Sequence, residues 1–423
     1  MTRIQNTPQL AINENRKLAL SIAEAALDAI DTASIISSSI SLVGNILRIQ
    51  GESFDLAQFK KIKVIGFGKA SCEAAHALEK ILGSKIDQGV VVGLKSIKCD
   101  YIETFAGTHP TPAFQNIEIG RKVFEMSTGS TEEDLVIVIV SGGGSSLLCW
   151  PEEECEQEVR LYNAFSKHGE NINELNTIRK HISHLKGGGL AKILFPATVI
   201  GLIFSDVPGN HFENVASGPT YKDTTTIADA KKLIDTYNLG DFNLIETPKD
   251  DMFFKKVSNF VLVSNVTALD AMKKKAESLG FSVEILSSEL YDEAKVVVQK
   301  IYEKRKSNTV ILAGGEPKVT GDKTGGSGGR CLFMGINALD TLAASPKQDS
   351  VFIFLASDGI DNSLSAGVVV DDDTLTKSVQ QKLDRADHIR RFDSYVFFEK
   401  TGDSIFTGPT NANVSDLMIL LTK

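Results

Sequence analysis

A buried-looking strand that ends at three consecutive glycines constrains the fold of this chain more than any other feature. LVIVIV at 135–140 has strand length and no polar residue, and SGGGSS follows at 141–146. A strand that is apolar throughout predicts burial on both faces, which is typical of a parallel sheet covered by helices. Apolar runs at 61–67, 89–94 and 197–205 alternate with segments of helical spacing, so we expect an α/β fold.

The length of 423 residues exceeds what one hydrophobic core usually serves, which favours two domains. A polar, irregular stretch across 220–258 interrupts the strand–helix alternation, and a new series begins with NFVLVSN. We therefore predict one α/β domain over 1–240 and a second over 241–423. The opening segment 10–48 is predicted to be mainly helix, and NINELNTIRKHISHLKGGG at 171–189 a polar helix ended by its glycines.

Composition excludes several classes of protein. The net charge of −9 lacks the excess of lysine and arginine that a nucleic-acid surface requires. The N-terminus is polar and the longest apolar runs are strand-sized, so we expect a cytoplasmic protein without a membrane span. The five cysteines are odd in number and show no C-x-x-C spacing, which predicts free thiols and gives no support to a zinc site.

Glycine-rich or acidic turns follow most of the predicted strands. They are GFGKAS at 66–71, SGGGSS at 141–146, SDVPGN at 205–210, AGGEPKVTGDKTGGSGGR at 313–330 and SDGID at 357–361. Ligands of open α/β sheets bind at the carboxyl ends of the strands, so these turns are the candidate site. A small anionic ligand suits this chain better than a polyanion.

The glycines predict an anion-binding turn, because they let backbone N–H groups face a phosphate without a Cβ in the way. The candidate phosphate-binding residues are Gly66, Gly68, Ser141, Gly142, Gly143, Gly144, Ser145 and Ser146. Tight packing of a strand-to-helix turn is the alternative interpretation. Neither turn is a Walker A motif; in GFGKAS, Ala70 stands at the Ser/Thr position of that motif. GFGKAS is not a full dinucleotide fingerprint either, because Ser71 stands where the third glycine should be. Lys69 suits phosphate neutralisation, although a solvated surface lysine fits the position equally.

Eight motifs, in this order, resemble those of the glycerate 2-kinases that carry a MOFRL C-terminal domain. They are VIGFGKAS, GTHPTP, VSGGGSSLL, LNTIRKHISHLKGGGLAK, SDVPGN…ASGPT, AGGEPKVTG…GGR, SDGID and DSYVFFEKTGDSIFTGPTNANV. The resemblance extends from about residue 60 to the end. It implies a Rossmann-like N-terminal domain and a MOFRL domain, with the active site in the cleft between them. It also implies ATP-dependent phosphorylation of D-glycerate at its 2-hydroxyl to 2-phosphoglycerate, with Lys69 and Arg330 as active-site residues.

The chain departs from the family pattern beside the second of these residues. The family usually continues GGR with Asn-Gln-Glu, whereas Cys331, Leu332 and Phe333 follow Arg330 here. Ala113 also replaces an aspartate, and TGPTNAN replaces the commoner TGPTGTN. The changes after Arg330 remove an amide pair and a carboxylate, so they bear on the identity of the substrate.

Phosphoryl transfer requires positioned charges more than covalent chemistry, and the strand-end residues can supply them. Lys69 and Arg330 would stabilise the transferring group, and Arg330 could also hold the carboxylate of glycerate in bidentate fashion. Asp206 and Asp358 are the candidates for the base and for Mg²⁺ ligation, and the sequence does not separate the two roles. Glu316 is a further strand-end carboxylate, available to Mg²⁺ or as a substrate-binding residue, and turn formation is the alternative role for each acid.

Other charged residues have weaker claims. Arg179, with the neighbouring lysine, could add positive charge to the substrate site or form a solvated helix face. The H-x-x-H spacing of His181 and His184 lacks a third ligand and is interpreted as coincidence. His109 could line the site or form a turn, and the acidic runs at 152–154 and 371–373 are expected to be solvated.

Three alternatives to a D-glycerate kinase remain open at this stage. The chain could phosphorylate a related small hydroxy or sugar acid, it could be a hydroxypyruvate reductase, or it could bind a phosphometabolite without turnover. The incomplete glycine fingerprint and the lack of a clear ribose-binding acid count against the reductase. Expected cofactors are ATP and Mg²⁺, the expected partner is a small molecule, and the sequence is compatible with a homodimer.

Overall fold

The computed structural model describes residues 2–165, 172–320, 325–344 and 349–423. They form two compact units. The N-terminal unit comprises Thr32–Val207 and His211–Leu262, and the C-terminal unit comprises the residues up to Asp31, Pro208–Asn210 and Val263–Lys423. The division therefore differs from the predicted boundary at 240 in two respects. The first unit extends to Leu262, and the opening helices pack in the second unit.

The N-terminal unit is built on a six-stranded sheet. Its order is β6-β5-β4-β7-β8-β9. The pairings from β6 through β8 are all parallel, as the apolar runs predict. The strands are β4 (Lys61–Phe67), β5 (Gln88–Gly93), β6 (Glu103–Ala106), β7 (Asp134–Ser141), β8 (Thr198–Phe204) and β9 (Val257–Val263). The chain winds outward in one direction from β4 and in the other from β7, so the order reverses between these two neighbours.

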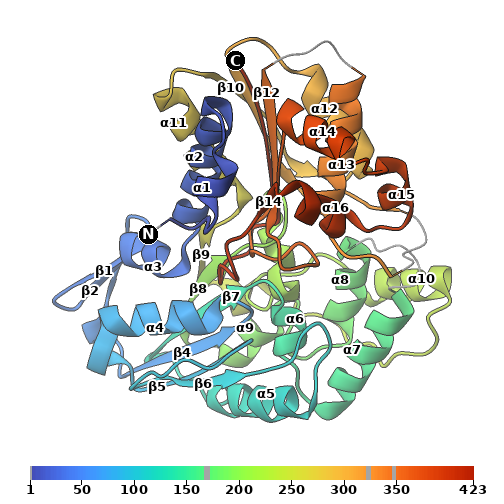
Figure 1. Ribbon diagram of the computed structural model, residues 1–423. Helices are drawn as coiled ribbons and strands as arrows, with labels where there is room; N and C mark the ends of the chain where they lie inside the picture. The colour runs from blue at the N-terminus through green and yellow to red at the C-terminus, as the bar shows by residue number, and fades with distance from the viewer. Residues whose placement is uncertain (1, 166–171, 321–324, 345–348) are drawn as a thin grey trace. The chain divides into compact units, whose positions relative to one another are not determined.

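Helices cover both faces of this sheet (Figure 1). α4 (Ser71–Leu82) packs on β4, β5 and β7, and α5 (Phe114–Ser127) and α9 (Gly189–Leu194) cover the opposite face. α7 (Glu152–Phe165), α8 (Ile172–His181) and α10 (Ile227–Tyr237) form a smaller apolar cluster of their own. The remaining short elements of this unit are α6 (Gly144–Leu147), η1 (Leu56–Gln58), η2 (Gly83–Lys85), η3 (Phe212–Ser217) and η4 (Asp251–Phe254).

Two predictions about the N-terminal unit were wrong in detail. The strand of NFVLVSN does not open the second domain, because it becomes β9, the sixth strand of the first sheet, where Phe260 packs edge-on against Phe54. The predicted helix of 10–48 stops early: after α3 (Thr32–Ser39) the chain forms β1 (Ile40–Val43), β2 (Ile46–Ile49) and β3 (Glu52–Asp55). Gly44, with φ +62°, supplies the turn between β1 and β2.

The polar helix predicted over 171–189 also ends sooner than its glycines. α8 stops at His181, and residue 171 lies outside the described residues. Ser183 and Glu154 accept the next backbone N–H groups, and Gly188, with φ +86°, is the N-cap of α9 instead of a helix stop. Glu154 was expected to be solvated, but it is buried and bonds Lys186 at 2.8 Å.

The C-terminal unit contains a second six-stranded sheet. Its order is β10-β11-β15-β12-β13-β14. β10 and β11 are parallel, whereas β15 runs antiparallel to both of its neighbours, β11 and β12. The strands are β10 (Ser282–Leu290), β11 (Thr309–Gly315), β12 (Ser350–Ala356), β13 (Gly367–Val370), β14 (Ser404–Ile405) and β15 (Asp416–Thr422). The strand nearest the C-terminus is thus central to its sheet.

Helices again cover both faces, and Figure 1 shows α2 beside α11 on one side of the strands. The other side carries α12, α13 and α16, whose apolar side chains form the main core with β11, β12 and β15. The helices of this unit are α1 (Thr7–Leu10), α2 (Glu14–Ala29), α11 (Asn265–Ser278), α12 (Ala294–Glu303), α13 (Arg330–Ala343), α14 (Asp372–Gln380), α15 (Arg385–Arg390) and α16 (Ser394–Thr401). Within the described residues no helix is both long and apolar enough to span a membrane.

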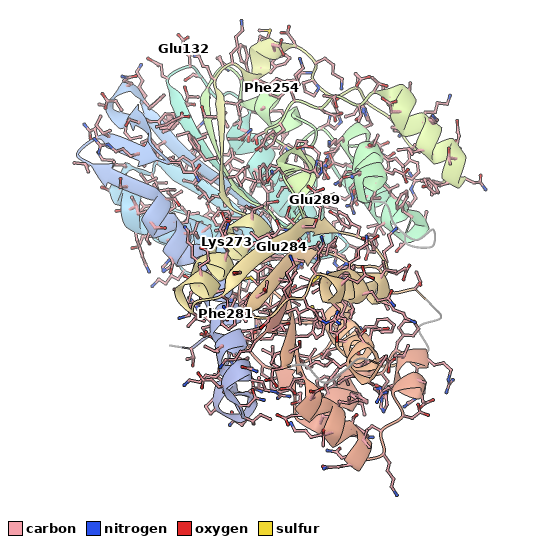
Figure 2. The ribbon with its side chains drawn as sticks, turned by 90° about the horizontal axis from the view of Figure 1, so that it is seen from above. Glu132, Phe254, Lys273, Phe281, Glu284 and Glu289 are labelled. Carbon is pink, nitrogen blue, oxygen red and sulfur yellow. A yellow bond between two sulfur atoms is a disulfide. The ribbon has the colours of Figure 1, made fainter. Side chains whose placement is uncertain are left out.

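A buried arginine explains why the opening helices belong to this unit. Arg16 of α2 is fully buried, and its guanidinium bonds Asp371 at 2.6 Å and Asp403 at 2.7 Å. Asp371 was expected to be solvated, but it caps α14 and pairs with Arg16 instead. The short segment 208–210 joins the same unit, because Gly209 (φ +79°) lies against Glu289 of β10, which Figure 2 labels.

Candidate active site

Two glycine turns flank the point where the strand order of the N-terminal sheet reverses: GFGKAS after β4 and SGGGSS after β7. Loops at such a reversal form the crevice in which open α/β sheets bind ligands. The Lys69 N–H donates to the Gly142 carbonyl oxygen at 2.9 Å, and the Ala70 N–H donates to the Ser141 hydroxyl at 3.1 Å. A Cβ on Gly68 would lie 2.2 Å from Ser141 Oγ, so the close approach of the two turns requires glycine.

The glycines after β7 bring side chains from three other loops together. A Cβ on Gly142 would lie only 1.9 Å from Oδ2 of Asp206, the residue two positions beyond β8. A Cβ on Gly143, which has φ +76°, would lie 2.9 Å from Cδ2 of His109 and 3.2 Å from Cγ of Lys69. Asp206, His109 and Lys69 therefore line one glycine loop at the carboxyl edge of the sheet.

Lys69 differs from the buried lysines of the same unit. It is half-buried, and its ammonium group makes no hydrogen bond or ion pair with any residue that the structure describes. The buried lysines each face a carboxylate, as in Lys63–Asp134, Lys180–Asp223 and Lys186–Glu154. A cationic group held beside a glycine turn without a carboxylate partner is suited to an anionic ligand.

His109 lies at the surface beside this lysine. Loss of water contacts, together with the positive charges of Lys69 and Arg179, lowers the pKa of His109 to about 4. The imidazole is therefore neutral at physiological pH and can donate or accept one hydrogen bond without adding a charge.

The predicted phosphate-binding residues do not all occupy equivalent positions. Gly66 lies within β4, where a Cβ would contact Val91, and a Cβ on Gly144 would lie 2.6 Å from that of Ala216. These two glycines serve tight packing. The helix expected after the glycines is only the four-residue α6, so it adds little to the field at the turn, whereas α4 after GFGKAS has twelve residues.

The two serines of the turn are already engaged in the structure. Ser145 Oγ lies 2.9 Å from Ser217 Oγ, and the Ser217 hydroxyl donates to Asn176 at 3.0 Å. The Ser146 hydroxyl donates to the Gly143 carbonyl oxygen at 3.2 Å. These bonds join the glycine loop to the ASGPT segment and to α8, and they fix its shape.

Arg179 does not form a solvated helix face. It is buried, and its Nε donates to Glu158 at 2.6 Å. The other carboxylate oxygen of Glu158 is buried without a partner among the described residues. The positive charge of Arg179 nevertheless acts on His109, where it adds to the larger effects of burial and Lys69 in lowering the pKa of the imidazole.

In the C-terminal unit Arg330 begins α13, and two acidic residues bind its side chain. Nε donates to Asp416 Oδ2 at 2.6 Å, and Nη2 donates to Asp416 Oδ1 at 3.4 Å. Nη2 also lies 3.5 Å from Glu316. The side chain of Arg330 is 39 % exposed, and that of Asp416 only 3 %. The side-on edge of the guanidinium is therefore already bound to a carboxylate of the chain itself.

The two aspartates of SDGID have different environments. Asp358 follows β12 and forms a turn, since its Oδ1 accepts from the Ile360 N–H at 3.1 Å. Asp361 is buried and accepts the backbone N–H groups that surround Arg330, those of Gly329, Cys331 and Leu332. Burial and the charge of Asp416 raise the pKa of Asp361 to about 7, against the opposing effect of these N–H groups.

The three residues that depart from the family pattern have structural roles. Cys331 and Leu332 are fully buried in the apolar core of the C-terminal unit. Phe333 stacks on Phe392, with ring centroids 5.7 Å apart. The Cys331 side chain nevertheless lies close enough to Arg330 and Asp416 to interact with both electrostatically. Residues 321–324 of the long glycine-rich loop lie outside the described residues.

Among the described residues, no three His, Cys, Asp or Glu side chains come together as a metal-binding group. The H-x-x-H pair forms no metal site either, because His181 is buried against Ile245 and Thr225. Mg²⁺ needs only one or two carboxylates when phosphate oxygens complete its coordination, so Asp206 beside the glycine loop fits as a single protein ligand.

The prediction of five free thiols was wrong. Cys149 and Cys155 form a disulfide on either side of the Trp150–Pro151 turn, just after the glycine loop. They lie six positions apart in the sequence, with a Cα–Cα distance of 5.6 Å, and the short turn brings them together. The other three cysteines are free.

Asp361 and Asp416 were both missed from the sequence. Asp416 lies at the amino end of an antiparallel strand, so the rule that ligands bind at the carboxyl ends of parallel strands does not identify it. Register pairs it with Gly315 and Ala356, so it reaches the same sheet edge as the ends of β11 and β12. A lone aspartate before the apolar run LMILLT was the available signal.

A doubly wound sheet with glycine turns at its reversal point, followed by a mixed α/β unit with a carboxylate-bound arginine, defines a class of two-unit α/β proteins that handle small anions. Two family models match the chain: a domain of unknown function (DUF4147) over residues 18–244, and the MOFRL family over 309–416.

The chain belongs to the glycerate 2-kinase family. It is 32% identical to a glycerate 2-kinase of Pyrococcus horikoshii over 96% of this chain and 97% of the relative. It is 31% identical to a D-glycerate 2-kinase of Thermotoga maritima over 87% of this chain and 92% of the relative. A crystal structure of a Thermotoga maritima glycerate kinase superposes with a TM-score of 0.82 at 30% identity, covering 96% of this chain and 99% of that one.

Proposed function

We propose that this protein transfers the γ-phosphoryl group of ATP to the 2-hydroxyl of D-glycerate, giving 2-phosphoglycerate and ADP. Membership of the family and the names of the relatives support a kinase of a small hydroxy acid. A kinase requires a nucleotide substrate, and the glycine loops supply N–H groups suited to phosphates.

The observation that carries the proposal is the position of Lys69. Its ammonium group has no acidic partner among the described residues, and it lies beside Gly143 at the reversal point of the sheet. A half-buried lysine beside a glycine turn, without a carboxylate partner among the described residues, is available to an anionic ligand, which supports this role. In this role Lys69 would neutralise the charge that develops on the transferring phosphoryl group.

The remaining roles follow from the side chains at the two sheet edges. Asp206 is assigned to Mg²⁺ or to the base that accepts the proton of the 2-hydroxyl, and Asp358 to the other of these roles. Mg²⁺, when bound, would neutralise charge on the phosphate oxygens. Arg330 would bind the carboxylate of glycerate, and Glu316, 3.5 Å from its Nη2, would add negative charge beside it.

A hydroxypyruvate reductase is the competing function, because a relative from Agrobacterium vitis, 34% identical over 85% of this chain, is provisionally so named. The first glycine turn opposes it: Ser71 occupies the place of the third glycine. At the end of β5, where a dinucleotide-binding fold places an acidic residue for the ribose, the chain reads Gly93-Leu94-Lys95.

ADP formation from MgATP tests the proposal. We would assay D-glycerate, L-glycerate, hydroxypyruvate and four-carbon sugar acids, and identify the product by its conversion to phosphoenolpyruvate with enolase. We expect turnover with D-glycerate and no oxidation of NADH or NADPH by hydroxypyruvate. Turnover with only another acid would show that this acid, and not D-glycerate, is the substrate. Oxidation of NADH or NADPH without ADP release would show that the protein is a reductase.

Lys69→Ala tests the role of Lys69 in phosphoryl transfer, and Lys80→Ala is its matched control. Lys69 lies just before α4, whereas Lys80 lies exposed in the last turn of the same helix. We expect Lys69→Ala to lower kcat at least about 100-fold, the scale of losing one preorganised electrostatic contact. Lys80→Ala should retain full activity. Equal activity of the two variants would remove Lys69 from the site.

A further inference from the structure

We propose that Asp416 and Asp361 are positioning residues that hold Arg330 from two sides, so that it binds an anionic substrate group only through its end-on Nη1–Nη2 edge. The proposal rests on the proposed function, in which Arg330 binds the carboxylate of the acid.

Asp416 fixes the side chain of Arg330. Its two oxygens bind Nε at 2.6 Å and Nη2 at 3.4 Å, which occupies the side-on edge of the guanidinium. Asp416 is almost fully buried and stands opposite Gly315 and Ala356 in the central strand of the sheet, so it has little freedom to move. A guanidinium offers two bidentate edges, and this contact leaves one of them.

The end-on Nη1–Nη2 edge of the Arg330 guanidinium remains for a ligand. Among the interactions of the described residues, no hydrogen bond or ion pair involves Nη1 of Arg330. Glu316 lies 3.5 Å from Nη2, beyond a good hydrogen bond, and so contributes charge more than direction. A ligand carboxylate can therefore form a two-point contact only end-on.

Asp361 fixes the backbone on which Arg330 stands. Its carboxylate accepts from the N–H groups of Gly329 at 3.2 Å, Cys331 at 3.2 Å and Leu332 at 2.7 Å. These N–H groups belong to the first turn of α13 and would otherwise lack intrahelical partners. No helix residue supplies the cap, because the N-cap Gly329 has no side chain.

The glycine before Arg330 is required by this arrangement. A Cβ on Gly329 would lie 2.1 Å from Asp361 Oδ1, which no packing tolerates. The GGR and SDGID motifs are thus structurally linked, because the second aspartate of SDGID accepts backbone N–H groups at the GGR motif. The first aspartate, Asp358, forms its own turn, in which its Oδ1 accepts from the Ile360 N–H.

The charges around Arg330 indicate that a substrate anion is bound through directed hydrogen bonds more than through net electrostatic attraction. Arg330 carries one positive charge against Asp416 and Glu316, and Asp361 lies close by with a pKa raised to about 7. With carboxylates outnumbering the cation, an incoming anion gains little from net charge. Its affinity must come from well-directed hydrogen bonds, which is the kind of contact that a fixed guanidinium supplies.

A double-mutant cycle tests the proposal through activity. Asp416→Asn and Asp361→Asn should each raise KM for the acid at least tenfold, with little change in KM for ATP. Combined with Arg330→Lys, each should add less than threefold to the loss of Arg330→Lys alone, because the partners act through the arginine. Asp416→Asn and Asp361→Asn that remain folded with unchanged KM, or losses that multiply with that of Arg330→Lys, would overturn the proposal.

Asp371→Asn is the matched control. Asp371 is also buried, also caps a helix and also binds an arginine, but that arginine is Arg16. The control should lower stability without changing KM for the acid. A rise in KM in Asp371→Asn equal to that in Asp361→Asn would show that both effects are only structural and would contradict a positioning role.

Modification of Arg330 by phenylglyoxal, followed by peptide mass spectrometry, supplies a readout that does not need turnover. Release of the side-on edge in Asp416→Asn should speed modification of Arg330 at least fivefold, and Asp416→Glu should restore part of the protection. If Arg330→Lys leaves kinetics unchanged but Asp416→Asn still speeds modification, the positioning stands and the substrate role of Arg330 fails. An unchanged modification rate in a folded Asp416→Asn protein overturns the positioning itself.

Discussion

Replacing Gly142 with alanine gives a sharp test of the glycine loop. The added Cβ would lie 1.9 Å from Oδ2 and 2.1 Å from Cγ of Asp206. Ordinary carbon contacts begin near 3.4 Å, so the loop or the carboxylate must move by about 1.5 Å. Both groups belong to the proposed site, and a misplacement of about 1 Å can cost 100-fold in rate.

We therefore expect Gly142→Ala to lower kcat for ADP formation about 100-fold. The overpacking itself should destabilise the fold by about 1–3 kcal/mol, measured by urea denaturation. Gly240→Ala is the control, because Gly240 has φ +86° but no neighbour within 4 Å of the added Cβ. It should lose about 1–2 kcal/mol through backbone strain while keeping its activity.

A second substitution identifies the clash. Gly142→Ala combined with Asp206→Gly should recover stability, because the side chain that the Cβ meets is gone, while activity stays low. If Gly142→Ala alone kept more than half of the wild-type kcat, the close approach of this loop to Asp206 would have no part in the reaction.

Further predictions concern stability and redox state. Arg16→Met should cost about 3–5 kcal/mol in urea unfolding, because Asp371 would be left buried and charged without its partner; a loss below about 1 kcal/mol would contradict this. Through His109 the folded state should lose stability as pH falls from 6.5 towards 4, whereas Asp361, with its raised pKa, acts in the opposite direction; the wild-type protein should therefore lose more stability over this range than His109→Gln. Thiol titration of the denatured chain should find three thiols, and five after reduction of Cys149–Cys155; five before reduction would disprove the disulfide.

The sequence predicts the N-terminal sheet well, because its strands carry continuous apolar runs that end in glycine turns. β7 and β8 lie where LVIVIV and ATVIGLIFS predict them. The edge strand β9 was assigned to the other unit, since a strand's own residues do not state which sheet it joins. Arg16 shows the same limit: its buried partners lie on residues far along the chain, and no local pattern marks them.

The residues of the candidate site also differ in whether the sequence alone can reveal them. Lys69 and Gly142 are visible as motifs, because glycines at strand ends have a local physical reason. Asp416 and Asp361 act through distant backbone and side-chain atoms of Arg330, so only the register of β15 and the course of the SDGID loop reveal them. The roles that depend on long-range pairing escape a single sequence for this reason.

The central place of β15 has a consequence for the order in which the chain is made. α2 is synthesised before the N-terminal unit, yet its neighbours α11, β12 and β15 all follow that unit in the chain. The N-terminal unit can complete its sheet first, whereas β11 and β12 have no strand between them until β15 emerges. The nascent chain must therefore keep an apolar helix and two unpaired strand edges from pairing with other chains until β15 has been made.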